Sequence, residues 1–391
     1  MRHIAIVIKL LNKKSGGAER LYCQLANKLS EMGYKVSCLI YEKGDVEPFY
    51  YLSNKVNFIN LYIRYKNRSL PSRLSQCKSF IPAGWLYDFC DYIGSDYDFY
   101  LQLKRYLKNQ LVDISISFMP PANTINSLAC RNLKVKSIIT NHNVPKHDYE
   151  NINRWGRNRV ERYLRKKMVS KADVIHVLFE EFSNWFSKVE KDKIKVIHNY
   201  VSDHFFESYG DIKKENLIIA VGRLAPVKNY KVLIEAFGMI WKKYPDWKVE
   251  IYGVGPQKKE LSDLVIEKNL QNSVLLKGHT KNIEKELERA KFFAHPALHE
   301  GFGLSVAEAL AKELPVIAFS DCDGVNQFVF NGLNGIMVER DSGSEGYAEA
   351  MSTLISNEKQ LDKLTKNSRQ SVFVFNQETY YKNWQYLISS I

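Results

Sequence analysis

The sequence predicts an α/β protein built from two doubly wound domains. Strands and helices alternate along both halves of the chain. The expected strands are short continuous apolar runs, which are typical of parallel sheets covered on both faces. A polar stretch at 202–215 lies between two strong strands, and 391 residues suffice for two or three domains. We therefore expect one domain at 1–205, a second at 206–376, and a last helix at 377–391.

The first half begins with an apolar run at 4–10, which predicts a central strand. Gly16 and Gly17 follow, and a helix is expected at 18–32, because leucines at 21, 25 and 29 share one face. Gly33 is a candidate to end that helix. Further strands are expected at 36–41, 56–63, 114–118, 135–140, 174–178 and 194–198.

The second half repeats the scheme with strands that are each followed by a helix. The expected pairs are 217–221 with 230–244, 249–253 with 258–269, 274–277 with 283–290, and 292–295 with 304–314, before a strand at 316–319. The segment 377–391 carries Tyr380, Tyr381, Trp384 and Leu387 at helical spacing. Its apolar face needs a packing partner.

Residues 64–109 are rich in aromatic side chains mixed with basic ones. One interpretation is a helical insertion packed on the sheet. The other is an interfacial surface at lipid headgroups, where aromatic and basic residues are favoured.

The net charge of +13 is concentrated in one half of the chain. Residues 1–205 hold 33 Lys and Arg against 19 Asp and Glu, whereas residues 206–391 hold 23 against 24. No acidic residue occurs at 48–87, and residues 154–171 carry eight basic residues against Glu161 alone. This excess indicates an anionic partner: nucleic acid, a membrane surface or a phosphorylated substrate. An apolar content of 45% and a charged content of 25% exclude collagen-like and wholly disordered classes.

The six cysteines include no Cys-x-x-Cys pair, which argues against a disulfide framework and a zinc site. The apolar run at 4–8 is too short to span a membrane, and no small-residue cleavage site follows it. We expect a cytoplasmic protein that can touch a membrane from that side.

The strongest motif places Glu300 and Glu308 on either side of the Gly301-Phe302-Gly303 turn. The glycines let the backbone approach a ligand closely. The amides at the start of the following helix form an anion site. Glu308 lies about five residues further into that helix, or ~7.5 Å along its axis, so it could accept hydrogen bonds from hydroxyls beside a bound phosphate.

A second motif, Gly222-Arg223 with Lys228 five residues later, directly follows the strand at 217–221. Ligands of open α/β sheets bind at the carboxyl ends of the strands. Arg223 and Lys228 could neutralise one anion there, including the charge that develops on a leaving diphosphate.

These motifs resemble those of the retaining glycosyltransferases of family GT4, which have the GT-B fold. Gly16-Gly17-Ala18-Glu19-Arg20 and Asn331-Gly332-Leu333-Asn334-Gly335 match the family as well, so the resemblance spans nearly the whole chain. It implies two Rossmann-like domains that face a central cleft. The first would bind the acceptor, the second would bind the nucleotide-sugar, and the last helix would cross back to the first.

The resemblance also implies individual roles. Arg223 and Lys228 would bind the diphosphate, Glu308 the ribose and Glu300 the hydroxyls of the donor sugar. His142, in the Thr140-Asn141-His142-Asn143 segment, matches a histidine near the reacting centre. The other expected donor contacts are Gly16, Gly17, Gly222, Phe302, Gly303 and Leu304.

The sequence departs from the family at Gln327, which stands where the family usually has Glu. Two Asp-x-Asp triplets, at Asp96 to Asp98 and Asp321 to Asp323, are too short to predict a metal site. Because Arg223, Lys228 and helix amides already supply positive charge, we expect no metal and no cofactor. Gly253-Val254-Gly255 lacks the third glycine of a dinucleotide fingerprint.

We expect transfer of a hexosyl or N-acetylhexosaminyl group from a nucleoside-diphosphate sugar, with UDP favoured and GDP possible. A polyprenyl-diphosphate-linked saccharide at the inner face of the cytoplasmic membrane would explain the basic half. Arg159, Arg162 and Lys166 share one helical face and are predicted to bind the acceptor diphosphate or anionic headgroups.

Three alternatives are weighed against this reading. A nucleotide-sugar 2-epimerase would share the fold and need no lipid acceptor. A nucleic-acid-binding protein would fit the charge, but no recognised binding module is present. A catalytically dead scaffold would not need the intact set of Arg223, Lys228, Glu300 and Glu308.

Overall fold

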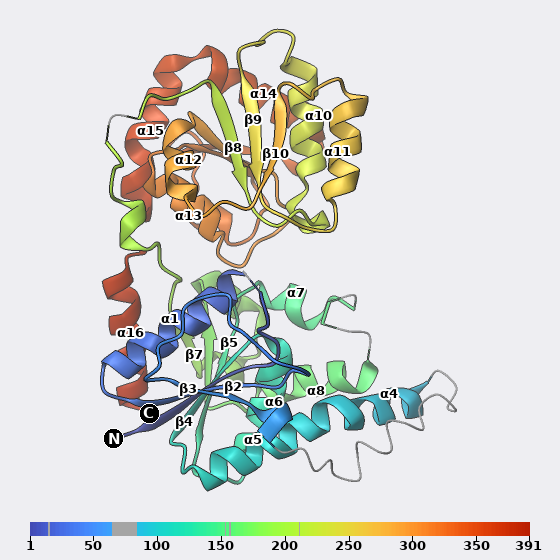
Figure 1. Cartoon of the computed structure of the whole chain (residues 1–391), viewed down its shortest axis with the longest axis vertical. Helices are drawn as coiled ribbons and strands as arrows, with labels where there is room; N and C mark the ends of the chain where they lie inside the picture. The colour runs from blue at the N-terminus through green and yellow to red at the C-terminus, as the bar shows by residue number, and fades with distance from the viewer. Residues whose placement is uncertain (15, 65–83, 153, 156–157, 211) are drawn as a thin grey trace. The chain divides into compact units, whose positions relative to one another are not determined.

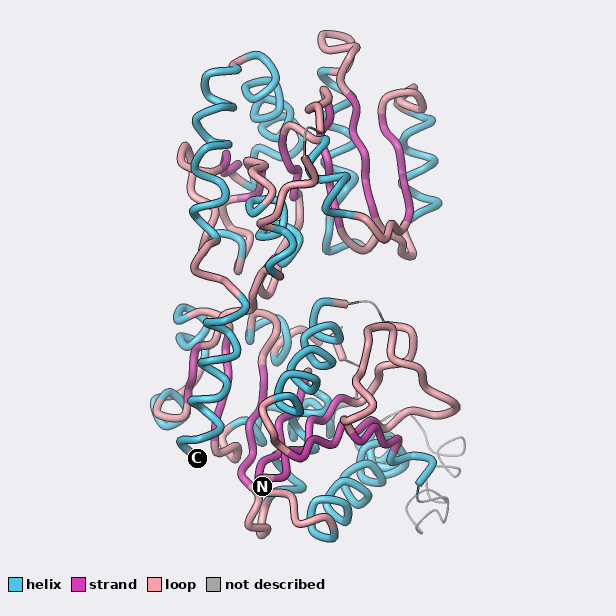
Figure 2. Tube along the Cα trace, turned by 60° about the vertical axis from the view of Figure 1, so that its left-hand side comes forward, coloured by secondary structure: helices cyan, strands magenta, loops and turns pink. Residues whose placement is uncertain are grey.

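The structure is a computed structural model that describes residues 1–14, 16–64, 84–152, 154–155, 158–210 and 212–391 (Figure 1). The chain forms two compact units: Met1–Ile197 with Tyr381–Ile391, and His198–Tyr380. Each unit has a parallel sheet with helices on both sides (Figure 2). This arrangement confirms the predicted α/β, doubly wound fold class. The division falls at residues 197 and 198, whereas the sequence analysis placed it at 205.

The sheet of the first unit has seven strands in the order β3-β2-β1-β4-β5-β6-β7. Each neighbouring pair is parallel. Every residue of β1 is buried, as expected for an apolar strand inside a sheet covered on both faces. The strands are β1 (His3–Ile8), β2 (Lys35–Ile40), β3 (Asn57–Asn60), β4 (Ile114–Phe118), β5 (Lys136–Thr140), β6 (Val174–Val177) and β7 (Ile194–Val196).

Apart from the last helix, α16, the helices of this unit lie between successive strands in the sequence. They are α1 (Gly17–Glu31), α2 (Leu61–Arg64), α4 (Trp85–Tyr92), α5 (Asp98–Asn109), α6 (Pro120–Cys130), α7 (Pro145–Tyr149), α8 (Arg159–Val169), α9 (Lys188–Lys191) and α16 (Gln377–Ser390). The leucines of α1 predicted to share one face are all buried.

The last helix packs on the first unit, beside α1 (Figure 1). Trp384 is fully buried, with its ring 5.2 Å from that of His176. Lys28 of α1 lies 5.6 Å above the ring of Tyr381, and Arg2 donates a hydrogen bond to the carbonyl of Ile388. The two ends of the chain therefore lie close together within this unit.

The strand expected at 56–63 is shorter than predicted, because β3 ends at Asn60 and α2 begins at Leu61. The side chain of Asn60 explains this correction. Its Oδ1 accepts hydrogen bonds from the backbone N–H groups of Tyr62 at 3.1 Å and Glu42 at 3.3 Å. An asparagine that bonds the backbone two residues onward turns the chain out of an extended conformation.

The aromatic-rich segment forms α4 and α5 joined by one π-helical turn, Ile93–Tyr97. In α5, Phe99 and Tyr106 are buried in the core with Leu39 of β2. In α4, by contrast, Trp85, Leu86 and Phe89 are exposed. The helix α5 is therefore packed in the core, as the first interpretation expects, whereas α4 presents apolar side chains to solvent. Residues 65–83 lie outside the described residues.

The sheet of the second unit has six parallel strands in the order β10-β9-β8-β11-β12-β13. They are β8 (Leu217–Val221), β9 (Lys248–Tyr252), β10 (Val274–Gly278), β11 (Phe292–His295), β12 (Val316–Phe319) and β13 (Gly335–Val338). The helices are α10 (Tyr230–Ile240), α11 (Lys258–Glu267), α12 (Ile283–Arg289), α13 (Leu304–Ala311), α14 (Gly343–Ser356) and α15 (Glu358–Val372). The elements β13, α14 and α15 were not among those predicted. Within the described residues, no helix is both long and apolar enough to span a bilayer.

Candidate functional site

The best-defined polar cluster of the second unit joins Lys228, Glu300 and His295. Lys228 Nζ donates a hydrogen bond to Glu300 Oε1, and His295 Nε2 lies 3.4 Å from the same oxygen. The side chains of Lys228 and Glu300 are each 17% exposed. This pair is therefore shielded enough for its charges to interact strongly.

The ionisation state of this cluster follows from its surroundings. Burial raises the pKa of Glu300, but the nearby Lys228 ammonium and His295 outweigh burial and hold that pKa well below its usual range. Burial lowers the pKa of His295, although Glu300 opposes the effect. At neutral pH, Glu300 is a carboxylate paired with a charged lysine, and the imidazole of His295 is neutral.

Two neighbouring strands bring Lys228 and Glu300 together. Lys228 ends a 3₁₀ turn, Pro226–Lys228, in the loop after β8, and Glu300 lies in the loop after the adjacent strand β11. The N–H of Leu298 bonds the carbonyl of Val227 at 2.8 Å and ties the two loops together. Both charges thus lie at the carboxyl edge of the sheet, where open α/β sheets bind ligands.

The glycines of the loop after β9 position the loop that carries Arg223. A Cβ on Gly253 would overlap the carbonyl oxygen of Gly222, and one on Gly255 would overlap that of Leu224. The Leu224 N–H also bonds the Val254 carbonyl at 3.1 Å. The Gly253-Val254-Gly255 segment, a weak dinucleotide signal in the sequence, therefore permits close packing of two loops.

Gly222 lies directly beside Lys228, because a Cβ on it would be 3.3 Å from Lys228 Nζ. Arg223 follows in the same loop and is exposed. Among the described residues, Arg223 forms no ion pair. The structure therefore brings Gly222 and Lys228 into contact and leaves the guanidinium of Arg223 in solvent on the same loop.

A glycine turn also begins the helix that carries Glu308. Gly303 has φ 83°, a left-handed conformation that favours glycine, and α13 starts at Leu304. A Cβ on Gly303 would lie 2.8 Å from Val325 Cγ2. Glu308 is buried in this helix. The turn thus joins Glu300 and Glu308 through one short segment, as their spacing indicates.

The side chain of Phe302 belongs to the core. It is buried, and its ring packs on those of Phe328 at 5.4 Å and Phe375 at 5.1 Å. The side chain is therefore not available to a ligand, and the predicted donor contact of this residue would have to come from its backbone. Gln327 lies in a short 3₁₀ turn, Val325–Gln327, and its Nε2 donates to Asn326 Oδ1 at 3.1 Å.

Both Asp-x-Asp triplets have structural partners. Asp96 forms an ion pair with Lys9, and Asp98 accepts a 2.6 Å hydrogen bond from the hydroxyl of Tyr41. Asp321 pairs with Arg340, whose Nε lies 3.1 Å from Asp321 Oδ2. In the part of the chain that the structure describes, no group of three or more His, Cys, Asp or Glu side chains is arranged to hold a metal.

In the first unit, His142 follows β5 and is buried. Its ring stacks on Phe118 at 4.7 Å and lies 5.7 Å from that of His176. Neither ring nitrogen has a hydrogen-bond partner among the described residues. Burial, and then His176, hold the pKa of His142 well below its usual value, so the ring is neutral.

Gly16 caps the start of α1 and Gly17 is the first residue of that helix. A Cβ on Gly16 would overlap the carboxylate of Glu19. The missing side chain therefore leaves room for this acidic group beside the helix N-terminus, where a negative charge is favourable.

The basic cluster at 154–171 is partly neutralised inside the first unit. Arg165 is buried, pairs with Glu161, and donates to the carbonyl of Asp148 at 3.0 Å. Arg154 Nε lies 2.9 Å from Asp148 Oδ1, and Arg159 Nε lies 2.9 Å from Asp88 Oδ2. Of the predicted acceptor face, Arg162 and Lys166 form no ion pair with any described residue.

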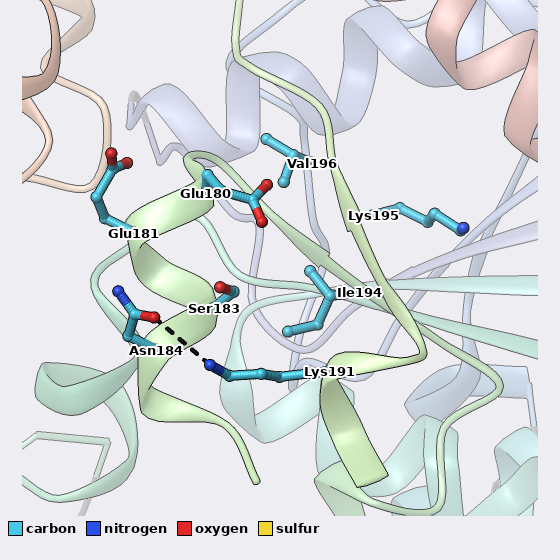
Figure 3. A pocket seen from close by; sticks show the side chains of 8 residues that line it. All are labelled: Glu180, Glu181, Ser183, Asn184, Lys191, Ile194, Lys195 and Val196. Carbon is cyan, nitrogen blue, oxygen red and sulfur yellow. Dashed lines mark hydrogen bonds between the residues drawn. The ribbon is translucent and has the colours of Figure 1, made fainter. Parts of the chain in front are cut away.

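A hollow of the first unit lies beside the edge strand β7 (Figure 3). Glu180, Glu181, Lys191 and Lys195 line it, together with four uncharged residues, so its charges balance. None of the predicted site residues lines this hollow. We therefore do not assign it to the site.

Sequence reasoning missed His295. The sequence did contain a signal for it: His295 is the last residue of an apolar strand, and His142, which was predicted as a site residue, lies two residues after the end of another. What the sequence could not supply was its proximity to Glu300, which depends on how the loop after β11 turns back.

Comparisons with known proteins agree with this architecture. Residues 15–205 match the family described as Glycosyltransferase Family 4, and residues 201–371 match Glycosyl transferases group 1. An uncharacterised glycosyltransferase of Haemophilus influenzae is 28% identical over 91% of this chain and 91% of that protein.

Two further proteins resemble the chain over its full length. The Campylobacter jejuni GalNAc-alpha-(1->4)-GalNAc-alpha-(1->3)-diNAcBac-PP-undecaprenol alpha-1,4-N-acetyl-D-galactosaminyltransferase is 26% identical, covering 100% of this chain and 99% of that enzyme. The solved structure of the pneumococcal O-GlcNAc transferase GtfA with UDP and GlcNAc has a TM-score of 0.76 at 14% identity, covering 100% of this chain and 99% of that one.

The fold and these matches define a glycosyltransferase of the GT-B fold. The chain belongs to the GT4-type glycosyltransferases, and the enzyme uses a nucleotide sugar.

Proposed function

We propose that the enzyme transfers a hexosyl or N-acetylhexosaminyl group, with retained anomeric configuration, from a UDP-sugar to a polyprenyl-diphosphate-linked saccharide. The observation that carries this proposal is the shielded Lys228–Glu300 pair at the carboxyl edge of the second sheet, with Arg223 exposed on the same loop. The Campylobacter relative is named for an undecaprenol-diphosphate-linked acceptor, and the pneumococcal structure holds UDP. A GDP-sugar would fit the same two cations.

The proposed chemistry needs no protein nucleophile. The bond between the anomeric carbon and the diphosphate oxygen breaks, and Arg223 and Lys228 stabilise the charge on the leaving nucleoside diphosphate. The acceptor hydroxyl oxygen bonds to the anomeric carbon from the same face, and its proton passes to the departing diphosphate. Glu300 would hold hydroxyls of the donor sugar and Glu308 those of the ribose.

His142 would act beside the reacting centre as a neutral imidazole. Because both of its ring nitrogens lack a partner in the described residues, each is available to a substrate group. We propose that no metal or other cofactor takes part, since the cations and the amides at the start of α13 supply the positive charge.

For the membrane, we propose that α4 and α8 form one interfacial surface at the inner face. Trp85, Leu86 and Phe89 of α4 are 58%, 62% and 50% exposed, and Arg162 and Lys166 lie on α8. The two helices are joined by a 2.7 Å hydrogen bond from Asn158 Nδ2 to the carbonyl of Asp88. Aromatic and basic side chains on one surface favour anionic headgroups.

The donor and acceptor are tested by incubating the enzyme with UDP-sugars and GDP-sugars and with polyprenyl-diphosphate disaccharides. Mass spectrometry detects the extended product, and the anomeric proton coupling in NMR reports its configuration. Hydrolysis of every donor without transfer would overturn the proposal. An epimerised UDP-sugar formed without acceptor would identify a 2-epimerase instead.

The membrane surface is tested with Arg162→Glu/Lys166→Glu. Arg159 is left intact because its pairing with Asp88 would confound a charge reversal. Turnover of the lipid-linked acceptor should fall, while cleavage of the donor without acceptor should persist. The matched control is Lys359→Glu/Lys363→Glu, which makes the same charge change on exposed positions of α15. Equal effects of the two variants would contradict the assignment.

A further inference from the structure

A second hollow of the first unit lies at the edge of the sheet opposite His142. It has a volume of about 400 Å³ and is formed by the end of α6, the turn into β5 and the loop between α8 and β6. Because β5 begins at Lys136 and His142 follows its other end, the hollow opens at the amino-terminal edge of the strands. Open α/β sheets bind their substrates at the carboxyl edge, so neither substrate is expected here.

The hollow carries an uncompensated positive charge. Arg131, Lys134, Lys136 and Lys171 line it, against a single acidic residue, Asp173. Lys136 Nζ lies 3.6 Å from Asp173 Oδ1, and Asp173 Oδ2 also accepts hydrogen bonds from the N–H and hydroxyl of Ser137 at 2.9 and 2.8 Å. The other three cations form no ion pair with any residue that the structure describes.

The partial negative charges at nearby helix ends do not fully neutralise this positive charge. The carboxyl ends of α6 and α8 adjoin the hollow, and each is equivalent to roughly −0.5 charge. Together with Asp173 they offset about two of the four positive charges. A net charge of about +2 is left, which matches a phosphate dianion.

The interior of the hollow contains a polar group that needs a partner. Ser127 of α6 lines the hollow, is 1% exposed, and its Oγ has no hydrogen-bond partner among the described residues. Buried hydroxyls are nearly always hydrogen-bonded, and an unmet one destabilises the fold. A phosphate oxygen that entered between the cations could accept the hydrogen bond of this hydroxyl.

We propose that this hollow is a phosphate-binding site, independent of the donor and acceptor sites. Arg131, Lys134 and Lys171 attract the phosphate at the rim, and Ser127 bonds it inside. The phosphate belongs either to the headgroup of an anionic lipid or to a soluble phosphorylated compound. The proposal does not rest on the proposed glycosyl transfer, because it uses none of the same residues.

The test is a titration of the full-length enzyme with inorganic phosphate at constant ionic strength, followed by the backbone amide NMR signals of residues 127–137. Saturable shifts in this segment are expected. Lys134→Glu/Lys171→Glu should weaken binding about tenfold, and Ser127→Ala should weaken it several-fold, on the scale of charge-assisted hydrogen bonds. The control Lys188→Glu/Lys195→Glu, two exposed positions of the same unit, should leave the titration unchanged.

Flotation with phosphatidylglycerol and phosphatidylcholine vesicles separates the two sources. Preferential binding to phosphatidylglycerol that is lost in Lys134→Glu/Lys171→Glu but kept in the control identifies a lipid headgroup. Saturable shifts without that preference identify a soluble phosphate compound. If inorganic phosphate produces no saturable shift in residues 127–137 and the charge reversal leaves vesicle binding unchanged, the proposal is overturned.

Discussion

Lys228 and Glu300 form a hydrogen-bonded ion pair between the loops that follow two adjacent strands, β8 and β11. The lysine proposed to neutralise the donor diphosphate is therefore engaged with the carboxylate proposed to hold the donor sugar. Because both side chains are largely shielded, neither can lose its partner without an energetic penalty. A bound donor must then either share Lys228 with Glu300 or replace Glu300 as its partner. The contribution of the pair to the free energy of unfolding can be measured in the absence of substrate.

The first prediction concerns the stability of the pair. Lys228→Ala should lower the free energy of unfolding by about 2–3 kcal/mol, because it leaves a shielded carboxylate with only a neutral imidazole beside it. Adding Glu300→Ala should restore part of that loss, with a coupling energy of about 1–3 kcal/mol in a double-mutant cycle. Urea denaturation measures all four proteins. Additive losses would show that the pair contributes nothing.

The second prediction separates the diphosphate from the sugar. Glu300→Gln removes the negative charge that competes for Lys228, so UDP alone should bind at least as tightly as it does to the unmodified enzyme. Glycosyl transfer should nevertheless fall by about 10²–10³, because a preorganised acceptor of sugar hydroxyl bonds is lost. Calorimetry with UDP and steady-state rates provide the two readouts. A parallel loss of UDP affinity would place Glu300 on the nucleotide instead.

Much of the second unit could be predicted from the sequence, since its strands are continuous apolar runs. The predicted bounds 217–221, 292–295 and 316–319 are those of β8, β11 and β12. Open α/β sheets bind ligands at the carboxyl ends of their strands. Correct strand bounds were therefore enough to identify the segments that contain Arg223, Lys228 and Glu300 as candidate binding loops.

What escaped prediction depends on contacts between distant segments. In the sequence, the residues of β13 looked like the end of the Asn-Gly turn that precedes them. They form a strand because they pair with β12. From the sequence alone, Arg165 was expected to be one more exposed basic residue of the cluster at 154–171. Its burial against the carbonyl of Asp148 depends on where α7 places that carbonyl, and only the i,i+4 spacing from Glu161 hinted at it.

The third prediction uses the glycines that position the Arg223 loop. Gly253→Ala places a methyl group on the carbonyl of Gly222, so the free energy of unfolding should fall by more than about 2 kcal/mol and UDP affinity should drop. The control is Gly238→Ala in α10, where the nearest atom, Leu270 Cδ1, is 3.5 Å away. That change should stabilise the helix by about 0.5–1 kcal/mol and leave UDP binding unchanged. Thermal unfolding with and without UDP compares the two. Unaltered UDP affinity in Gly253→Ala would show that loop position is unimportant.

The fourth prediction concerns metal removal. Treatment with excess EDTA should leave the transfer rate unchanged, because Arg223 and Lys228 are proposed to provide the cationic charge. Arg223→Ala should lower the rate by about 10²-fold under the same conditions. Restoration of an EDTA-inhibited enzyme by Mg²⁺ or Mn²⁺ would reverse this assignment.

The fifth prediction follows from the buried, neutral His142. Its pKa in the folded protein lies well below the ordinary value of 6.5, so below pH 6.5 the unfolded chain binds a proton that the folded chain does not. Stability is therefore fully present above about pH 6.5 and declines as the pH falls towards the folded pKa, by up to about 1.4 kcal/mol per pH unit for this residue. In His142→Phe, which keeps an aromatic ring against Phe118, that part of the slope should vanish. Urea unfolding between pH 5 and 7 measures it. A substitution that only loosened packing would lower stability equally at every pH, so a slope identical to that of the unmodified enzyme would show that His142 is not held neutral.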